Sequence, residues 1–453
     1  MATACFLKLH MTNNYLPEVR KQYEALPYPP CDPEDDRSRL ARTWLEDLPM
    51  INHYCFAGKQ SFQNNFRVLV AGGGTGDATI FLAEQLRALK AENAQVVHLD
   101  MSQASIEIAQ RRAEIRGLTN ITWVQDSLLN LPARATELGR FDYINCSGVL
   151  HHLADPDLGL KALLSVLRID DKLPGAIGMM VYGAVGRLGV YQIQRLMCMI
   201  NDKSDATVQD MKRKITNTRD LLACLPSTNW FMRGEELHHD HKDGDAGVYD
   251  LLLHSQDRAY TVSELYDWLG SYGMHLNFSD VQRGRAPYLP HMVLGLQPPV
   301  MLPVLRKLPL RQQHEMAELM IGNLITHSLY LTQSENCAAL YGDGLYIPFF
   351  YHEPITGESA AQVFSSNQGK PFMLKHQHSG VSLTVNPGRY GPQLLRLIDG
   401  QKSFQEIFDA FRTAWRGQAI APDNSALFAD FADCYETLNA LELILLRHPD
   451  ATH

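Results

Sequence analysis

The sequence predicts an α/β protein with a doubly wound parallel sheet, a helical cap inserted into it and a small α+β domain at the C-terminal end. Three observations carry this prediction. Apolar β-type runs alternate with helical patterns between residues 66 and 183, a glycine-rich turn follows the first run, and prolines near residue 300 precede a separate pattern. Such alternation is typical of a parallel sheet covered by helices on both faces.

Length and composition narrow the class of protein. The chain has 453 residues, a formal net charge of −9, 45% apolar and 20% charged residues. These values exclude a disordered chain, and no run approaches the ~18 apolar residues of a membrane span. The acidic balance argues against non-specific nucleic-acid binding. The eight cysteines show no CxxC pair and no zinc or iron–sulfur spacing, so we expect reduced thiols in a cytoplasmic protein.

The elements of the sheet follow one another in regular order. Strands are predicted at Phe66–Ala71, Gln95–Asp100, Ile121–Gln125, Tyr143–Cys146 and Ile177–Tyr182. The helices between them are predicted at Asp77–Ala91, Ser102–Arg116 and Pro156–Leu167. Asp155 is typical of an N-cap, and Pro156 of a first helical residue. Another helix, Pro17–Ala25, precedes the sheet and ends before a Pro-rich stretch, because X-Pro steps disfavour helix.

Shifts in pattern divide the chain into four parts. We expect an N-terminal segment over 1–64, the sheet domain over 65–297 with its helical insertion at about 186–250, a helical connection over 298–370 and a C-terminal domain over 371–453. Proline clusters mark the later boundaries. The C-terminal domain is predicted as a strand at Val381–Val385, helices at Leu394–Ile398 and Ser403–Trp415, and a long helix that ends in Leu443–Leu446.

The end of the sheet domain carries a helix and two short apolar runs. The run Ala259–Gly273 is predicted as a helix opened by Thr261, because Thr261 and Glu264 have the spacing of a capping box. The runs Met274–Asn277 and Met292–Leu296 are expected to supply the last strands of the sheet.

A glycine-rich turn, Gly72-Gly73-Gly74-Thr75-Gly76, follows the first strand. Glycines permit a tight turn and let backbone N–H groups approach a ligand at the start of a helix. Asp100 ends the second strand at roughly the ~20-residue offset of an acid that binds ribose hydroxyls. The spacing is G-x-G-x-G, which differs from the dinucleotide pattern G-x-G-x-x-G, and no Lys and Ser/Thr follow as in a P-loop.

The glycine turn, Asp100, the Gln125-Asp126-Ser127 step and the run Phe141–His152 together resemble class I S-adenosylmethionine-dependent methyltransferases, over roughly residues 60–185. The resemblance implies a Rossmann-like methyltransferase sheet with S-adenosylmethionine as its cofactor. Asp100 would accept the ribose hydroxyls and Asp126 the adenine amino group. The implied cofactor-binding residues are Gly72, Gly73, Gly74, Gly76, Asp100, Met101, Asp126, Ser127, Cys146, Ser147 and Tyr23. Many members carry an acid where this chain has Val70, so the cofactor's amino group would be recognised elsewhere.

The N-terminal segment adds to the resemblance. Gln22-Tyr23-Glu24 and Pro27-Tyr28-Pro29 are similar to the opening of a bacterial methyltransferase group, in which such segments fold over the cofactor. Tyr23 and Tyr28 would then close the site, and an aromatic face would attract the sulfonium by ~0.5–2 kcal/mol. The alternative is that both tyrosines only pack in the core.

Candidate catalytic residues follow the fourth and fifth strands. Methyl transfer needs an aligned nucleophile and often a base, and ligands bind at the carboxyl edge of such sheets. His151 and His152 are candidate bases, with Tyr182 at the same edge. A structural role is the alternative, since many methyltransferases with different substrates begin a helix with two histidines. Arg187 would either clamp a substrate anion or be an ordinary solvated arginine.

Other polar clusters are less specific. His238, His239 and His241 lie among charged residues and are interpreted as a solvated loop, so we expect no metal site. The step Asn52-His53-Tyr54-Cys55 echoes a motif of SET-domain lysine methyltransferases, but it precedes the sheet and is interpreted as chance.

Residues 378–448 loosely resemble a winged-helix domain that follows some bacterial methyltransferases, including lysine methyltransferases of surface proteins. The resemblance rests on Leu394–Gly400 and the helix from Ser403. Gln405, Glu406 and Asp409 make that helix acidic, which disfavours DNA and favours a protein-contact or homodimerisation module.

These patterns lead to one preferred function and two alternatives. The preferred function is methyl transfer from S-adenosylmethionine to an unidentified acceptor, either a protein lysine or a small metabolite. The first alternative is a non-catalytic regulatory or scaffold protein that keeps the cofactor pocket. The second, a nicotinamide dehydrogenase, would need a glycine one residue further along the turn.

Overall fold

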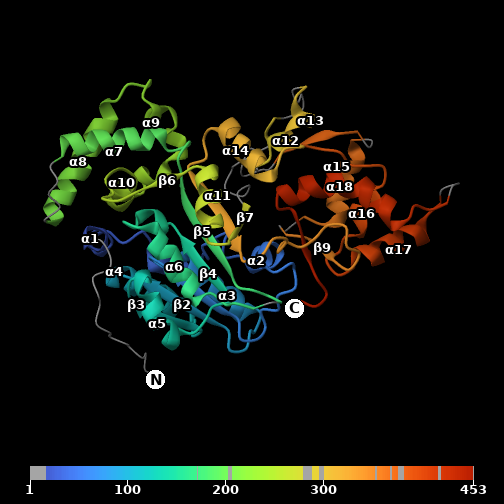
Figure 1. Cartoon of the computed structure of the whole chain (residues 1–453), viewed down its shortest axis with the longest axis horizontal. Helices are drawn as coiled ribbons and strands as arrows, with labels where there is room; N and C mark the ends of the chain where they lie inside the picture. The colour runs from blue at the N-terminus through green and yellow to red at the C-terminus, as the bar shows by residue number, and fades with distance from the viewer. Residues whose placement is uncertain are drawn as a thin grey trace. The chain divides into compact units, whose positions relative to one another are not determined.

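The computed structural model describes residues 17–451 apart from 171, 202–206, 279–287, 295–299, 352–354, 368–369, 376–381 and 417–419. The described residues form two compact units (Figure 1). The first comprises those of Met1–Asp47, Phe62–Leu265 and Gly322–Ser328. The second comprises those of Leu48–Ser61, Tyr266–Ile321 and Leu329–His453. In this part of the chain no helix has the length and apolarity to cross a membrane.

The first unit is built on a parallel sheet. Its strands are β1 (Arg67–Ala71), β2 (Gln95–Asp100), β3 (Ile121–Gln125), β4 (Tyr143–Ser147) and β5 (Ala176–Gly183). They lie in the order β3-β2-β1-β4-β5, and every pair is parallel. The order in which strands are added to the sheet therefore reverses between β1 and β4. At this switch point open α/β sheets bind ligands beyond the carboxyl ends of their strands. The predicted strands and the predicted α/β fold class are confirmed.

Helices connect the strands. They are α3 (Asp77–Ala88), α4 (Gln103–Arg116), α5 (Leu131–Leu138) and α6 (Pro156–Val166), which flank the sheet in Figure 1. The sequence predicts α3, α4 and α6, whereas α5 is an additional helix. Asp155 caps α6 by accepting from the backbone N–H of Asp157, as expected. Ser102 caps α4 in the same way through Ser105. Local polar signals thus set where these helices begin.

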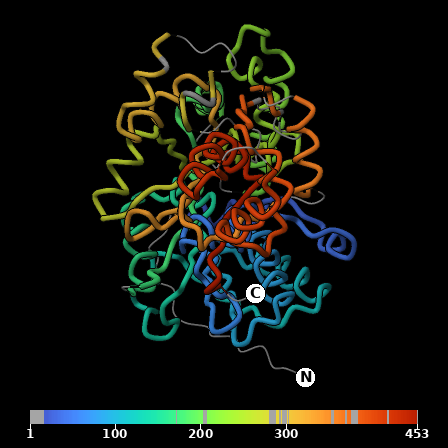
Figure 2. The backbone as a smooth tube through the Cα atoms, turned by 90° about the vertical axis from the view of Figure 1, so that its right-hand side faces the viewer, coloured from blue at the N-terminus to red at the C-terminus, as the bar shows by residue number. Residues whose placement is uncertain are grey.

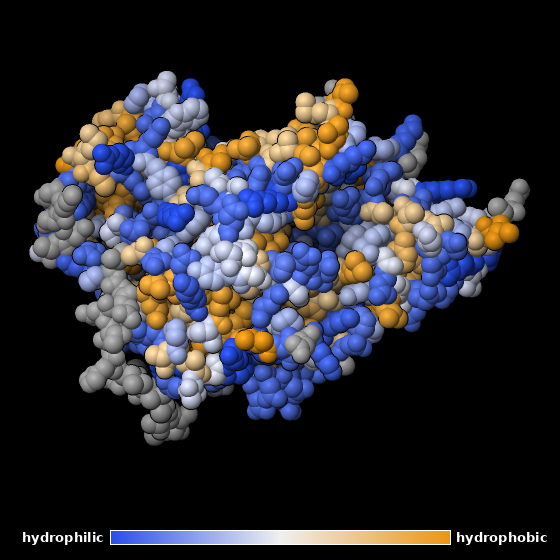
Figure 3. Space-filling model, in the orientation of Figure 1, coloured by the Kyte–Doolittle hydropathy of each residue, from blue (hydrophilic) through white to orange (hydrophobic). Residues whose placement is uncertain are grey.

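A helical insertion follows β5. It contains α7 (Leu188–Ile200), α8 (Val208–Cys224), α9 (Trp230–Arg233) and α10 (Gly244–Leu252). Its core is apolar, but Leu188, Met199 and Trp230 remain exposed; apolar patches appear over this part of the surface in Figure 3. The insertion ends at β6 (Ala259–Tyr260), which pairs in parallel with β5. The capping box of Thr261 and Glu264 is present and opens α11 (Val262–Gly270). The expected helix Ala259–Gly273 is thus too long at both ends, because Ala259 and Tyr260 pair with β5 and the helix ends at Gly270.

The second unit contains short strands and helices. It includes α2 (Leu48–Cys55), α13 (Leu302–Leu305) and α14 (Leu310–Ile321). β7 (His275–Phe278) pairs antiparallel with the later residues of β8 (Thr326–Thr332), which confirms the first of the two predicted short strands. The other run, Met292–Leu296, is partly wrong: α12 (Pro290–Val293) begins at a proline suited to a first helical turn, and residues 295 and 296 lie outside the described residues.

The C-terminal part of this unit is α+β. Its elements are β9 (Ile347–Phe350), α15 (Gly357–Ser366), β10 (Phe372–Lys375), β11 (Ser382–Val385), α16 (Gly391–Leu397), α17 (Phe404–Ala414), α18 (Asn424–Ala440) and β12 (Ile444–Arg447). Helices α16–α18 group together around buried Phe404, Phe408 and Phe431 (red in Figure 2). The expected helical end at Leu443–Leu446 is wrong, because Glu442 adopts a positive φ of 53° and the chain turns into β12, which pairs with β9. The winged-helix assignment stays a prediction.

Candidate functional site

Asp100 is held at the edge of the sheet by backbone amides. The N–H groups of Gly74 and Ser102 each donate to its carboxylate at 2.8 Å. Burial raises the pKa of this carboxyl, and the two amides oppose that rise. The predicted glycine turn and the predicted acid are therefore brought into direct contact, with Met101 between Asp100 and the N-cap of α4.

The glycine turn needs its glycines for two physical reasons. Gly76 has a φ of 104°, and a Cβ there would lie 2.8 Å from the Cβ of Ala109. Gly74 has a φ of 51°, and a Cβ there would lie 2.6 Å from the carbonyl oxygen of Tyr28. The turn is thus tightly packed against both α4 and the N-terminal segment.

The N-terminal segment, α1 (Pro17–Ala25) with the residues up to Pro30, is fastened along this edge. Thr75 Oγ1 donates to the carbonyl of Pro29 at 2.8 Å. The carboxylate of Glu24 accepts from the N–H groups of Gln103 and Ala104 at 3.0 and 3.1 Å. A carboxylate at a helix N-terminus is favourable because those N–H groups have no helical partner. The segment therefore lies beside the glycine turn and the first turn of α4.

Asp126 follows β3 and already has a charged partner. Its carboxylate accepts from Ser127 N at 2.8 Å, Asn130 Nδ2 at 2.7 Å and Arg134 Nη1 at 3.1 Å. Sequence reasoning missed Arg134. It lies in the first turn of α5, and nothing in the local sequence indicates that it pairs with Asp126. Any adenine contact of Asp126 would therefore use a carboxylate that is already oriented, by Ser127 and Asn130 at Oδ1 and by Arg134 at Oδ2.

Cys146 and Ser147 end β4. The Cys146 side chain is fully buried, and burial raises the pKa of its thiol to about 12, so the side chain is a neutral part of the core. Ser147 is half-buried at the carboxyl edge. The Cys146 side chain therefore offers no charged or exposed group to a ligand.

The two predicted histidines differ in their surroundings. His151 is fully buried and stacks on Tyr182 with ring centroids 3.8 Å apart, and neither of its ring nitrogens has a hydrogen-bond partner among the described residues. Burial lowers its pKa well below 6.5. His152 Nδ1 lies 2.8 Å from the carbonyl oxygen of Gln256, an acceptor, so Nδ1 carries the proton and Nε2 keeps its lone pair. Burial lowers the pKa of His152 as well, which favours this neutral form.

Asp250 and His254 join this cluster from the helical insertion. Asp250 accepts from Tyr23 Oη at 2.9 Å and from Tyr182 Oη at 3.4 Å. His254 stacks on His152 at 3.8 Å, and its Nε2 lies 3.3 Å from Tyr23 Oη. Sequence reasoning missed both residues; an Asp and a His four positions apart at the end of an apolar run were the signal available.

The ligand atoms of His152, Asp250 and His254 lie within 4.8 Å of one another, which raises the question of a metal. The two imidazoles stack with an interplanar angle of 21°, so their in-plane lone pairs run side by side and do not converge. His254 Nδ1 also accepts from the N–H of Gln256 at 3.1 Å, which places its proton on Nε2. The arrangement is therefore a hydrogen-bond network and a poor metal site.

Two residues that the sequence suggests to be solvated, Arg187 and His238, are buried. Arg187 is buried, its Nη2 lies 3.2 Å from Asp257, and its guanidinium lies 3.5 Å from the ring centroid of Tyr182. A buried ion pair with a cation–π contact replaces the expected solvated arginine. His238 is also buried and stacks on Phe231, since the insertion folds this loop onto its own core, whereas His239 stays exposed.

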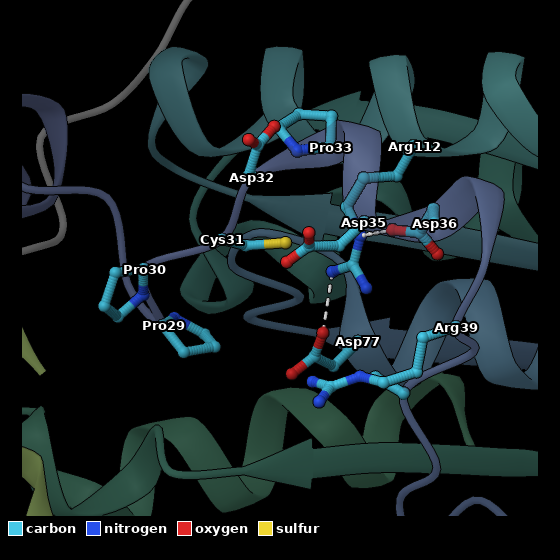
Figure 4. A pocket seen from close by; sticks show the side chains of 11 residues that line it. Pro29, Pro30, Cys31, Asp32, Pro33, Asp35, Asp36, Arg39, Asp77 and Arg112 are labelled. Carbon is cyan, nitrogen blue, oxygen red and sulfur yellow. Dashed lines mark hydrogen bonds and ion pairs between the residues drawn. The ribbon is translucent and has the colours of Figure 1, made fainter.

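A cavity of about 670 Å³ lies along the N-terminal segment, next to Cys31 and Arg112 (Figure 4). Arg112 bridges Asp36 and Asp77 there, as the dashed lines show. None of the predicted site residues lines it. The residues that line it include none of the cluster around Asp250, so the two features are distinct.

Comparison with known proteins identifies the domain type. Residues 62–174 match the family described as a methyltransferase domain. An uncharacterised protein of Synechococcus sp. is 31% identical over 276 residues, which cover 60% of this chain and 62% of that protein. The match thus spans less than two thirds of that relative.

Solved structures show the same fold. PKMT2 from Rickettsia typhi in complex with AdoHcy has a TM-score of 0.58 at 16% identity, over 93% of this chain and 78% of that one. A second structure of PKMT2 from Rickettsia typhi has a TM-score of 0.55 at 14% identity, over 98% of this chain and 77% of that one. At this identity the likeness concerns the fold, and it agrees with the predicted Rossmann-like sheet.

Proposed function

Because this chain contains a class I S-adenosylmethionine-dependent methyltransferase domain, we propose that it transfers a methyl group from S-adenosylmethionine to an acceptor at the carboxyl edge of its sheet. The observation that carries the proposal is the contact of Gly74 N with Asp100 beside a buried polar cluster of His152, Asp250 and His254. The AdoHcy bound to the similar PKMT2 supports the choice of cofactor.

The residues around Asp100 fit that cofactor. Asp100 receives backbone N–H groups and forms no ion pair with any described side chain, so its remaining lone pairs are free for ribose hydroxyls. When bound, S-adenosylmethionine supplies an electrophilic methyl group on a sulfonium. The residues proposed to hold it are Gly72, Gly73, Gly74, Gly76, Asp100, Met101, Asp126, Ser127, Cys146, Ser147 and Tyr23.

Of the three candidate catalytic residues, His152 has the geometry of a base. Its Nδ1–H is held by Gln256, which leaves Nε2 as a proton acceptor, and a ring nitrogen of His152 lies within 4.8 Å of an Asp250 carboxylate oxygen. Tyr182 donates to Asp250 and orients that carboxylate. His151 is buried against Tyr182, so we assign it the positioning of that ring.

Labelled methyl transfer tests this proposal. The chain, incubated with methyl-labelled S-adenosylmethionine and with separated protein and metabolite fractions of a cell extract, should label one fraction. His152→Gln should abolish labelling and keep S-adenosylhomocysteine binding. Cofactor binding without labelling of either fraction would favour the non-catalytic scaffold. The same experiment separates a protein lysine from a small metabolite as acceptor.

We also propose a protein-contact or homodimerisation role for the C-terminal part and a cytoplasmic location for the chain. The acidic first turn of α17, with Glu406 in the capping box of Ser403, disfavours DNA and leaves a protein-contact or homodimer role. Free cysteines, such as buried Cys55 and Cys146, agree with a reducing cytoplasm.

A further inference from the structure

Asp250 is a buried carboxylate whose hydrogen-bond donors are all neutral. Tyr23 Oη donates at 2.9 Å, Tyr182 Oη at 3.4 Å and Gln22 Nε2 at 3.5 Å. The nearby Arg187 instead forms its ion pair with Asp257. Among the residues that the structure describes, no arginine or lysine forms an ion pair with Asp250.

Other buried aspartates of this unit are paired differently. Asp36 pairs with Arg112 and Arg116, Asp126 with Arg134, and Asp142 with Arg168. A buried charge without a partner is costly, so native proteins pair such groups or use them to bind ligands. We therefore interpret Asp250 as a carboxylate whose positively charged partner is part of a bound ligand.

The surroundings of Asp250 suit an organic cation. The hydroxyls of Tyr23 and Tyr182 hold the carboxylate, and the aromatic rings near it are those of Tyr23 and of the stacked imidazoles His152 and His254. Aromatic faces attract ammonium groups. Tyr182 ends β5 and His152 follows β4, which places the cluster at the carboxyl edge of the sheet, where ligands bind.

We propose that the methyl acceptor is an amine that enters as an ammonium ion, with Asp250 as its counter-ion. This inference rests on the proposed function and narrows it to one class of nucleophile. Both a lysine side chain and a small metabolite amine belong to that class.

His152 completes the chemistry. The ammonium gives one proton to His152 Nε2; the N–H bond breaks, its electron pair stays on nitrogen as the nucleophilic lone pair, and the imidazole becomes an imidazolium. The positive charge moves from one neighbour of Asp250 to another, so the net charge of the site is unchanged. The new N–C bond then forms as the methyl C–S bond breaks and its electron pair remains on sulfur.

A binding experiment tests the proposal without turnover. The probes are n-butylamine, which is protonated at pH 7, and n-butanol, which is neutral. Saturation-transfer NMR is recorded on the full chain in the presence of S-adenosylhomocysteine. We expect a signal for n-butylamine, at least a fivefold weaker one for n-butanol, and loss of the n-butylamine signal in Asp250→Asn.

Two controls make the outcome decisive. Asp142→Asn neutralises another buried carboxylate, which accepts from the N–H of Arg67 at the amino end of the strands, and should keep the n-butylamine signal. Calorimetry of Asp250→Asn with S-adenosylhomocysteine should give wild-type affinity and show that the variant is folded.

Each contrary result has a different meaning. An n-butylamine signal that survives in Asp250→Asn, or equals that of n-butanol, overturns the amine assignment. If Asp250→Asn instead weakens S-adenosylmethionine at least tenfold and spares S-adenosylhomocysteine, the cation of Asp250 is the sulfonium, and the amine assignment is again wrong. A wild-type chain that fails to bind S-adenosylhomocysteine contradicts the proposed function itself.

Discussion

Tyr23 donates a hydrogen bond to Asp250 at 2.9 Å, although the two residues are 227 positions apart in the chain. This contact joins the N-terminal segment to the helical insertion. Tyr23 Oη also lies 3.3 Å from His254, and the carbonyl of Tyr23 accepts from Ser102 Oγ at 3.1 Å. One residue thus contacts both the edge around Asp100 and the cluster around Asp250.

Removal of the Tyr23 hydroxyl should loosen this junction. Tyr23→Phe keeps the ring and leaves Asp250 with one donor fewer, so we expect a loss of about 1–3 kcal/mol in unfolding free energy from the buried carboxylate. Chemical denaturation measures it. Tyr272→Phe, at a turn in the second unit, is a control for the loss of a tyrosine hydroxyl elsewhere. Equal effects of the two variants would contradict a special role for Tyr23.

Gly76 should not tolerate a side chain. Its φ of 104° and the 2.8 Å approach of a Cβ to Ala109 predict that Gly76→Ala costs about 1–3 kcal/mol of stability. Gly270→Ala is the matched control, because a Cβ there has no neighbour within 4 Å and its φ lies outside the positive range. It should be neutral or stabilising by up to about 1 kcal/mol. Thermal unfolding of both variants checks this difference, and equal melting temperatures would refute it.

Buried histidines should make the fold sensitive to mild acid. Burial lowers the pKa of His98 to about 3, whereas an unfolded histidine titrates near 6.5. Between pH 3 and pH 6.5 the unfolded chain therefore carries a proton on His98 that the folded chain does not bind. The contribution of neutral His98 to stability is full above pH 6.5 and falls as the pH drops towards 3. His98→Gln should reduce the pH dependence of unfolding by up to about 1.4 kcal/mol per pH unit between pH 6 and 5. An unchanged slope in urea denaturation would show that His98 is not buried in its neutral form.

His152 and His151 should respond differently to substitution. His152→Gln removes the Nε2 lone pair that we assign to proton transfer, and should lower the rate at saturating substrate by about 10²–10⁴-fold with unchanged S-adenosylhomocysteine affinity. His151→Gln should act mainly on folding, because His151 is buried and stacked on Tyr182. Single-turnover methyl transfer separates the two effects; a larger rate loss in His151→Gln would reverse the assignment.

Much of the sheet could be predicted because its signals are local. The apolar runs of β1–β5 and caps such as Asp155 are read within a few residues. The partners of Asp250 could not be predicted from the sequence, since Gln22 and Tyr23 lie more than 220 positions away. Arg187 was misjudged for the same reason: a charged side chain looks solvated until its distant partner, Asp257, is known.

The central claim is that the glycine turn and Asp100 bind S-adenosylmethionine. Isothermal calorimetry with S-adenosylmethionine, S-adenosylhomocysteine and NAD tests it most directly, on the wild-type chain, Asp100→Ala and the exposed control Glu107→Gln. We expect micromolar binding of the first two ligands, none of NAD, wild-type affinity in Glu107→Gln, and at least a tenfold loss in Asp100→Ala from the missing charge-assisted hydrogen bonds. Unchanged affinity in Asp100→Ala, or binding of NAD alone, would contradict the account.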